Sequence, residues 1–160
     1  MKYELTKAAK TAYGVTLYQI RALTSFKDVN RGDLGGWIEK ENNLSQHGDA
    51  WVHGEAMVFG NARVFGNARV FGRAWVLGDA WVHGNVWVFG NACVQDNARL
   101  WSDAQVFGNA WVYGDAQVFG RACVYGNARA FGNARVYGDS RVHGEAMVCG
   151  DMFTKKDKSV

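Results

Sequence analysis

Hydrophobic and polar positions alternate with a short, fixed period between Gly48 and Cys149. Seventeen six-residue groups such as GNARVF follow one another there without an insertion, and in each the third and fifth positions are small or aliphatic, mostly Ala and Val. Alternation with a period of two is typical of a short β-strand with one buried face. The glycine that opens nearly every group accepts the positive φ of a tight corner. The pattern therefore predicts an all-β protein made of many two-residue strands.

Three strands with their corners form a triangular coil of eighteen residues, so residues eighteen apart should stack in ladders. An aliphatic residue followed four places later by a small one, as in Val58 and Ala62, resembles the hexapeptide-repeat proteins. The resemblance implies a single-stranded, left-handed parallel β-helix, and the hand rests on the resemblance alone. A degenerate group at 42–47, with Leu44 at the Ala position and Gln46 at the Val position, brings the total to about six coils.

Residues 1–41 lie outside the regular repeat and are expected to form a small N-terminal β-hairpin cap. Residues 3–6 and 15–23 have strand character, with a hairpin connection at 7–14. The open end of a parallel solenoid needs such a cover. The apolar residues expected to provide it are Leu17, Ile20, Leu23 and Phe26.

The β-helix is expected to cover residues 42–153, with Met152 and Phe153 closing its C-terminal end. Residues 154–160 are polar and predict a disordered tail.

The stretch DVNRGDLGGWIEKENNLS at 28–45 is not required by β-helix geometry. It resembles the leader of hexapeptide-repeat proteins from phages and enterobacterial prophages, which are often described as transferases or polymer-forming proteins. The resemblance implies a phage or prophage origin.

Charge and cysteine content narrow the choice of partners. The net charge is +3, but residues 48–149 carry eight Arg, no Lys and eight acidic residues, so the repeat body is formally neutral. A general nucleic-acid binder would show a basic stripe there. Cys93, Cys123 and Cys149 are not spaced by eighteen, which predicts free thiols in a reducing compartment. With no transmembrane-length apolar run and no signal peptide, we expect a protein of the bacterial cytoplasm that binds no membrane.

Function is expected on the outward positions, which form three faces with a period of eighteen. The first face starts at Trp51 and His53, the second at Met57 and Phe59, and the third at Arg63 and Phe65. These faces are too aromatic for a soluble monomer, so self-association is expected, and the resemblance to hexapeptide-repeat proteins implies a homotrimer. Its predicted contacts on the second face are Met57, Phe59, Trp75, Leu77, Trp111, Tyr113, Phe131 and Met147.

The sequence argues against an enzyme, and no catalytic residue, cofactor or metal site is predicted. Hexapeptide acyltransferases have loops that interrupt the coils, and none does so here. His53, His83 and His143 occupy the aromatic position of the repeat, where a further ring in a ladder is expected more often than a general base. A zinc site of the γ-carbonic-anhydrase type is disfavoured, because no two of the histidines in one chain are close enough to share a metal.

Two hypotheses about the function remain. In the first, the third face binds a small, planar, anionic ligand such as a nucleotide signal, sequestered from host defence in clefts between subunits. Its predicted residues are Arg63, Arg99, Arg135, Trp81, Trp101 and His83. The competing interpretation of these arginines is ion pairing with Asp79, Asp103, Asp115 or Asp139 at the corners. In the second hypothesis the solenoid is a structural or assembly protein without a small ligand.

Overall fold

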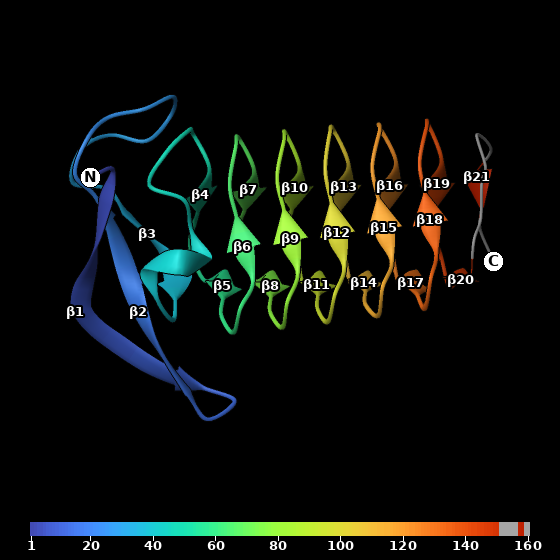
Figure 1. Cartoon of the computed structure of the whole chain (residues 1–160), viewed down its shortest axis with the longest axis horizontal. Coiled ribbons are helices and arrows are strands. Elements are labelled where there is room, and N and C mark those ends of the chain that lie inside the picture. Colours follow the sequence, from blue (N-terminus) through green and yellow to red (C-terminus); the bar gives the residue numbers. More distant parts are fainter. Residues whose placement is uncertain (151–156, 159–160) are drawn as a thin grey trace.

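The computed structural model describes residues 1–150 and the backbone of 157–158, and Figure 1 shows them as a row of coils with a hairpin at one end. The strands are β1 (Tyr3–Ala12), β2 (Val15–Ala22), β3 (Leu34–Ile38), β4 (Trp51–Val52), β5 (Met57–Val58), β6 (Arg63–Val64), β7 (Arg69–Val70), β8 (Trp75–Val76), β9 (Trp81–Val82), β10 (Trp87–Val88), β11 (Cys93–Val94), β12 (Arg99–Leu100), β13 (Gln105–Val106), β14 (Trp111–Val112), β15 (Gln117–Val118), β16 (Cys123–Val124), β17 (Arg129–Phe131), β18 (Arg135–Val136), β19 (Arg141–Val142), β20 (Met147–Cys149) and β21 (Asp157–Lys158). One short 3-10 helix, η1 (Glu41–Asn43), precedes the coils.

The strands form three sheets that make up the sides of the solenoid. The first face is a seven-stranded sheet, ordered β21-β19-β16-β13-β10-β7-β4. The second face is a nine-stranded sheet, ordered β1-β2-β3-β5-β8-β11-β14-β17-β20, and the third is a five-stranded sheet, ordered β18-β15-β12-β9-β6. Strands of neighbouring coils pair in parallel with partners eighteen residues apart, as Trp87 does with Arg69 and Gln105. The predicted parallel β-helix of about six coils is confirmed, while the hand of the winding stays a prediction.

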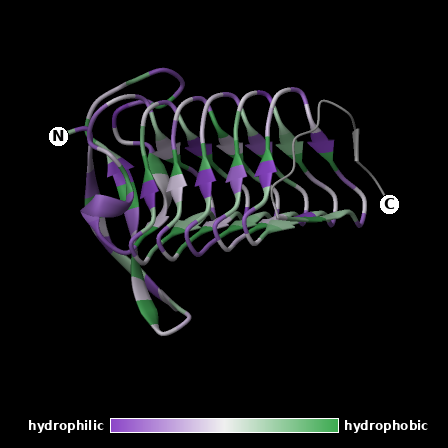
Figure 2. Cartoon of the chain, turned by 45° about the vertical axis from the view of Figure 1, so that its right-hand side comes forward, coloured by the Kyte–Doolittle hydropathy of each residue, from purple (hydrophilic) through white to green (hydrophobic). Residues whose placement is uncertain are grey.

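The core is a column of small and aliphatic side chains. From Ala50 to Val148 the Ala and Val positions of the repeat are at most 2% exposed, and hydrophilic and hydrophobic residues alternate along the strands (Figure 2). Burial of this apolar surface is the main stabilising contribution to such a fold.

Successive coils approach closely at the glycine corners. Gly90 has φ +68, and a Cβ atom placed on it would lie 3.0 Å from the backbone nitrogen of Gly108 in the next coil. Two corners carry a side chain at positive φ instead, namely Asp96 (φ 58) and Ser102 (φ 60).

The N-terminal hairpin is longer than the sequence suggested. Strand β1 continues to Ala12, with an irregularity between Leu5 and Ala9, and only the Tyr13–Gly14 turn separates it from β2. The prediction of a connection over 7–14 was therefore wrong, because residues 7–12 belong to β1 and residues 9–12 pair with β2 rather than forming a loop. The Tyr13 ring stacks on Phe59 at 6.4 Å and meets Trp75 edge-on at 4.7 Å. The hairpin therefore both caps the solenoid and lies against its second face.

The predicted cap residues divide between two clusters. Ile20 and Phe26 pack against the core of the solenoid, whereas Leu17 joins a separate cluster with Met57 and Phe59 under the hairpin. Leu23 is half-buried.

The register before Gly48 also differs from the prediction. Leu44 bridges Val64, twenty residues later, and the amide of Ser45 donates to the carbonyl of Val64. The normal register returns at Asp49, whose backbone amide donates to the carbonyl of Gly66, the same spacing as between Asn61 and Gly78. Two additional residues therefore lie between Ser45 and Asp49, so Leu44 fills the position of an inward Val, and Gln46 instead bonds to the backbone of Tyr3.

Met152 and Phe153, predicted to close the C-terminal end, lie outside the described residues, and so does most of the predicted tail at 154–160. Only the backbone of β21 is described in that tail, and it pairs in parallel with β19. Among the described residues, no helix is long and apolar enough to cross a membrane.

Candidate functional site: an arginine and aromatic face

The third face presents two parallel columns of side chains. The first column is in strict register on β6, β9, β12, β15 and β18 and consists of Arg63, Trp81, Arg99, Gln117 and Arg135. The structure therefore brings the predicted arginines and Trp81 into one line, with Trp101 and His83 in the column beside it.

That second column is a continuous stack of rings. The ring centroids are 4.7 Å apart for Phe65 and His83, 6.3 Å for His83 and Trp101, and 4.3 Å for Trp101 and Phe119. Phe119 and Tyr137 extend the stack at 4.9 Å. Ring stacking along a ladder stabilises the sheet, and it also makes this column a flat wall beside the arginines.

The three arginines are exposed and lie against the rings rather than against carboxylates. The guanidinium of Arg99 is 4.5 Å from the Trp81 ring centroid, and that of Arg63 is 5.8 Å from the same ring. Arg135 lies 5.9 Å from both Phe119 and Tyr137. All these distances are within the range of cation–π attraction.

The alternative of ion pairing at the corners is not observed within residues 1–150. Asp79, Asp103 and Asp115 accept hydrogen bonds from the asparagine amides of the preceding coil, and Asp139 pairs with Arg121 at 2.7 Å. No acidic group among the described residues pairs with Arg63, Arg99 or Arg135. This face therefore has three cations that neighbouring carboxylates do not neutralise.

A cavity of about 500 Å³ lies at the N-terminal end of the third face. Arg63, Phe65 and Trp81 form one side, and the segment from Glu41 to Gln46 forms the other. Burial and the nearby Arg99 lower the pKa of His83, so its ring is neutral at pH 7. A neutral histidine fits its place in the ring stack.

The predicted interface residues of the second face fall into two groups. Met57 and Phe59 are buried by the hairpin of their own chain, and Trp75 and Leu77 pack against that cluster. Farther along the solenoid, Trp111 is 41% and Met147 61% exposed. Tyr113 and Phe131 stack at 5.2 Å between these coils.

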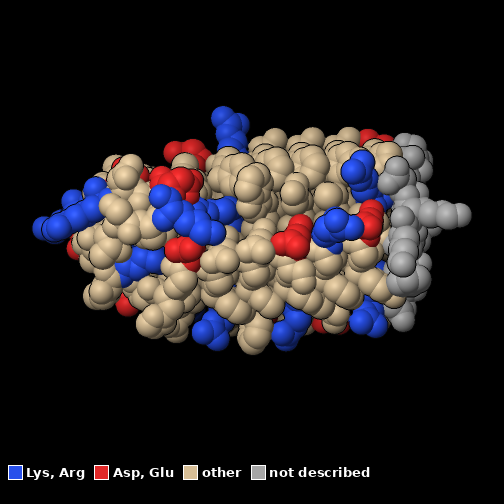
Figure 3. Space-filling view, turned by 90° about the horizontal axis from the view of Figure 1, so that it is seen from above, with Lys and Arg blue, Asp and Glu red and all other residues tan. Residues whose placement is uncertain are grey.

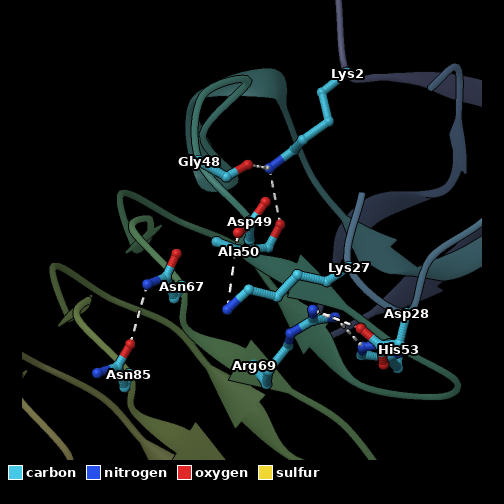
Figure 4. Close-up of polar contacts among 10 residues, drawn as sticks. All are labelled: Lys2, Lys27, Asp28, Gly48, Asp49, Ala50, His53, Asn67, Arg69 and Asn85. Carbon is cyan, nitrogen blue, oxygen red and sulfur yellow. Dashed lines mark hydrogen bonds and ion pairs between the residues drawn. The ribbon is translucent and has the colours of Figure 1, made fainter. Parts of the chain in front are cut away.

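A polar cluster on the first face was not predicted. Arg69, only 8% exposed, binds Asp28 at 2.6 Å and the Nε2 atom of His53 at 3.1 Å (Figure 4). Burial of the His53 side chain lowers its pKa most, and the positive charge of Arg69 lowers this pKa further. Asp28 belongs to the loop between β2 and β3, so the cluster fastens this loop to the solenoid. Seen from above, the densest group of charged side chains lies toward this N-terminal end (Figure 3).

Groups suited to catalysis or metal binding are scattered. No cluster of three or more His, Cys, Asp or Glu able to hold a metal ion occurs in the described part of the chain. His53, His83 and His143 each contact aromatic rings. Burial raises the pKa of the Cys93 thiol to about 11, which keeps it protonated and weakly nucleophilic at neutral pH.

Comparisons with known proteins agree with this architecture. A family model described as "YdcK Beta solenoid repeat" matches residues 104–120 and 128–144. The repeat body is a hexapeptide-type β-solenoid. A curated relative, "Uncharacterized acetyltransferase YdcK" of Escherichia coli (strain K12), is 45% identical over 42 residues, which are 26% of this chain and 13% of that protein. The match therefore spans only a small part of the relative's length.

Proposed function

We propose that this β-solenoid is a non-catalytic binding protein whose third face holds a small, planar, anionic ligand. The observation that carries the proposal is the line of exposed arginines, Arg63, Arg99 and Arg135, which lie against aromatic rings and form no ion pair with a carboxylate of the described chain. Unneutralised cations next to flat rings are suited to a ligand that combines negative charge with a planar group.

The chemistry of a nucleotide fits both columns. A guanidinium group binds phosphate through two parallel hydrogen bonds, and the outward edges of the stacked rings beside it can contact the face of a base edge-on. The cavity beside Arg63 and Trp81 gives such a ligand a partly enclosed position. The resemblance of residues 28–45 to phage proteins supports a specific role, namely sequestration of a nucleotide messenger of host defence.

We further propose a homotrimer in which the ligand lies in clefts between subunits. A single coil surface is shallow, so a second chain would be needed to enclose a ligand on the third face. The exposed Trp111 and Met147 on the second face support association, because exposed apolar patches of this kind mark interfaces. Met57 and Phe59 are already covered within one chain, so the C-terminal half of the face is the part we assign to the contact.

A thermal-shift panel of mono-, di- and cyclic nucleotides tests the binding proposal. A ligand that binds the native state raises the melting temperature as its concentration rises, and Arg99→Ala or Trp81→Ala should remove the shift. Arg141→Ala is the control, because Arg141 is also an exposed arginine but lies on β19 of the first face, away from both the third face and the proposed subunit contact. A panel without any shift would contradict the proposal.

A structural or assembly role is the second candidate, supported by the unbroken row of coils between Gly48 and Cys149. It predicts no saturable ligand. An acyltransferase activity is a weaker candidate that rests on the printed name of the partial relative. It predicts stabilisation by acyl-CoA, measurable in the same panel.

A further inference from the structure

The first face has a hollow of about 790 Å³ at its N-terminal end, beside the polar cluster described above. The loop between β2 and β3 closes one end of the hollow with Lys27 and Asp28, and the rings of Phe71 and Trp87 form its apolar side. Its size lies within the range of small-molecule sites in proteins. It is separate from the third face, so it does not depend on the function proposed there.

Trp87 lines this hollow with an exposed side chain. Its indole is 48% exposed, and its ring contacts with Phe71 and Phe89 are both edge-on, with interplanar angles of 78° and 76°. Trp101 differs, because it stacks between two parallel rings. No ring of the described chain therefore stacks in parallel on Trp87.

Hydrogen-bonding groups lie opposite the rings. Asn67 donates to Asn85 at 3.1 Å along a corner of the solenoid (Figure 4). Asn85 in turn donates to Asp103 at 2.9 Å. Each amide has two N–H donors and a carbonyl oxygen with two lone pairs, so the ladder leaves further groups for a ligand. The Asp28 side chain is 70% exposed although it binds Arg69, and it can accept further hydrogen bonds.

The charges around the hollow are balanced, unlike those of the third face. Arg69 pairs with Asp28 at 2.6 Å, and Lys27 lies 3.8 Å from Asp49. Burial and the charge of Arg69 also lower the pKa of His53, which favours the neutral form of its ring. A site with paired charges does not favour an anion over a neutral ligand.

From this arrangement we infer that the hollow is a binding site for a neutral, hydroxyl-rich ring, that is, a sugar. The C–H groups of a pyranose ring are suited to the electron-rich face of Trp87. Its hydroxyl groups both donate and accept, which matches the amides of Asn67 and Asn85 and the carboxylate of Asp28. The Asp28–Arg69 pair acts by holding the loop at the edge of the site.

Saturation-transfer NMR on the full-length protein tests this inference with glucose, galactose, N-acetylglucosamine, maltose and lactose as probes. We expect transfer to at least one of them, loss of that signal in Trp87→Ala and Asn85→Ala, and its retention in two matched controls. Trp111→Ala removes an equally exposed indole from the second face, and Asn109→Ala removes an amide from another corner ladder.

Three results would overturn the inference: no transfer to any of the five sugars in the native protein, transfer that persists in Trp87→Ala, or Trp87-dependent binding of nucleotides but not sugars. Circular dichroism of each variant shows whether the solenoid is still folded. If Trp87→Ala does not fold, Trp87→Phe takes its place and should weaken the signal by reducing the ring surface.

Discussion

The guanidinium carbon of Arg99 lies 4.5 Å from the centroid of the Trp81 ring, and the two residues pair across β12 and β9. The contact orients the guanidinium without neutralising its charge, since the attraction to a ring is electrostatic but involves no anion. Arg63 approaches the same ring from the other side at 5.8 Å. Trp81 is thus flanked by two cations, and this arrangement is the geometric basis of the binding proposal.

The ion pair between Asp28 in the loop between β2 and β3 and Arg69 in the solenoid should contribute to the free energy of unfolding. Asp28→Asn removes the charge that faces the buried Arg69, and we expect it to lower the free energy of unfolding by about 1 kcal/mol, because the carboxylate itself is largely exposed. The control is Asp139→Asn, whose pair with Arg121 is exposed on both sides and should cost below about 0.5 kcal/mol. Urea unfolding measures both, and equal losses would contradict the assignment of Arg69 as a buried cation.

Stability should fall as the pH decreases below about 6.5, the ordinary pKa of histidine. The pKa values of His53 and His83 are lowered in the folded state, so the unfolded chain takes up protons at a higher pH than the folded chain does. The loss begins below the unfolded pKa and ends once the pH falls below the folded values. His53→Gln and His83→Phe should each flatten this part of the curve. The urea midpoint of each variant is measured between pH 8 and pH 5. If neither substitution changes how the midpoint depends on pH, the titration of these histidines does not cause the loss of stability.

The corner at Ser102 is a point of backbone strain that a single substitution should relieve. Its φ of 60 is a glycine conformation, and Ser102→Gly should raise the free energy of unfolding by roughly 0.5–1 kcal/mol once the greater entropy of glycine in the unfolded chain is subtracted. Asn133→Gly is the control, because Asn133 does not have a positive φ, and it should destabilise the fold. If both glycine variants shift the urea midpoint in the same direction, strain at Ser102 is not the cause.

The second face should hold the trimer together through its C-terminal half. Trp111→Glu places a charge among exposed apolar residues, and we expect it to convert a trimer at micromolar concentration into monomers in sedimentation velocity. Trp87→Glu changes a similarly exposed residue on the first face and should leave the trimer intact. A native protein that sediments as a monomer would refute this assignment, as would dissociation by Trp87→Glu alone.

Much of the solenoid could be predicted because the repeat determines its own geometry. Inward Ala and Val, together with glycine corners, are sufficient to place Arg63, Trp81 and Arg99 in one column, and the structure has them there. The period contains no information about contacts between the repeat and residues outside it. The pairing of Asp28 with Arg69 joins the loop to the first face across 41 positions, and no spacing pattern indicates it.

The N-terminal hairpin was harder to predict for a related reason. Residues 7–12 are polar or small, so their hydrophobic pattern does not distinguish a strand from a loop. They belong to a strand because residues 9–12 pair with β2, and the position of the turn then brings Tyr13 onto Phe59 and Trp75. The burial of Met57 and Phe59 follows from this tertiary packing and not from their place in the repeat.

Isothermal titration calorimetry tests the binding function most directly. The nucleotide giving the largest thermal shift is titrated into the native protein, Arg99→Ala and Arg141→Ala. The account predicts saturable binding to the native protein, at least tenfold weaker binding to Arg99→Ala, equivalent to about 1.4 kcal/mol, and unchanged binding to Arg141→Ala. Equal affinity for the native protein and Arg99→Ala would contradict it.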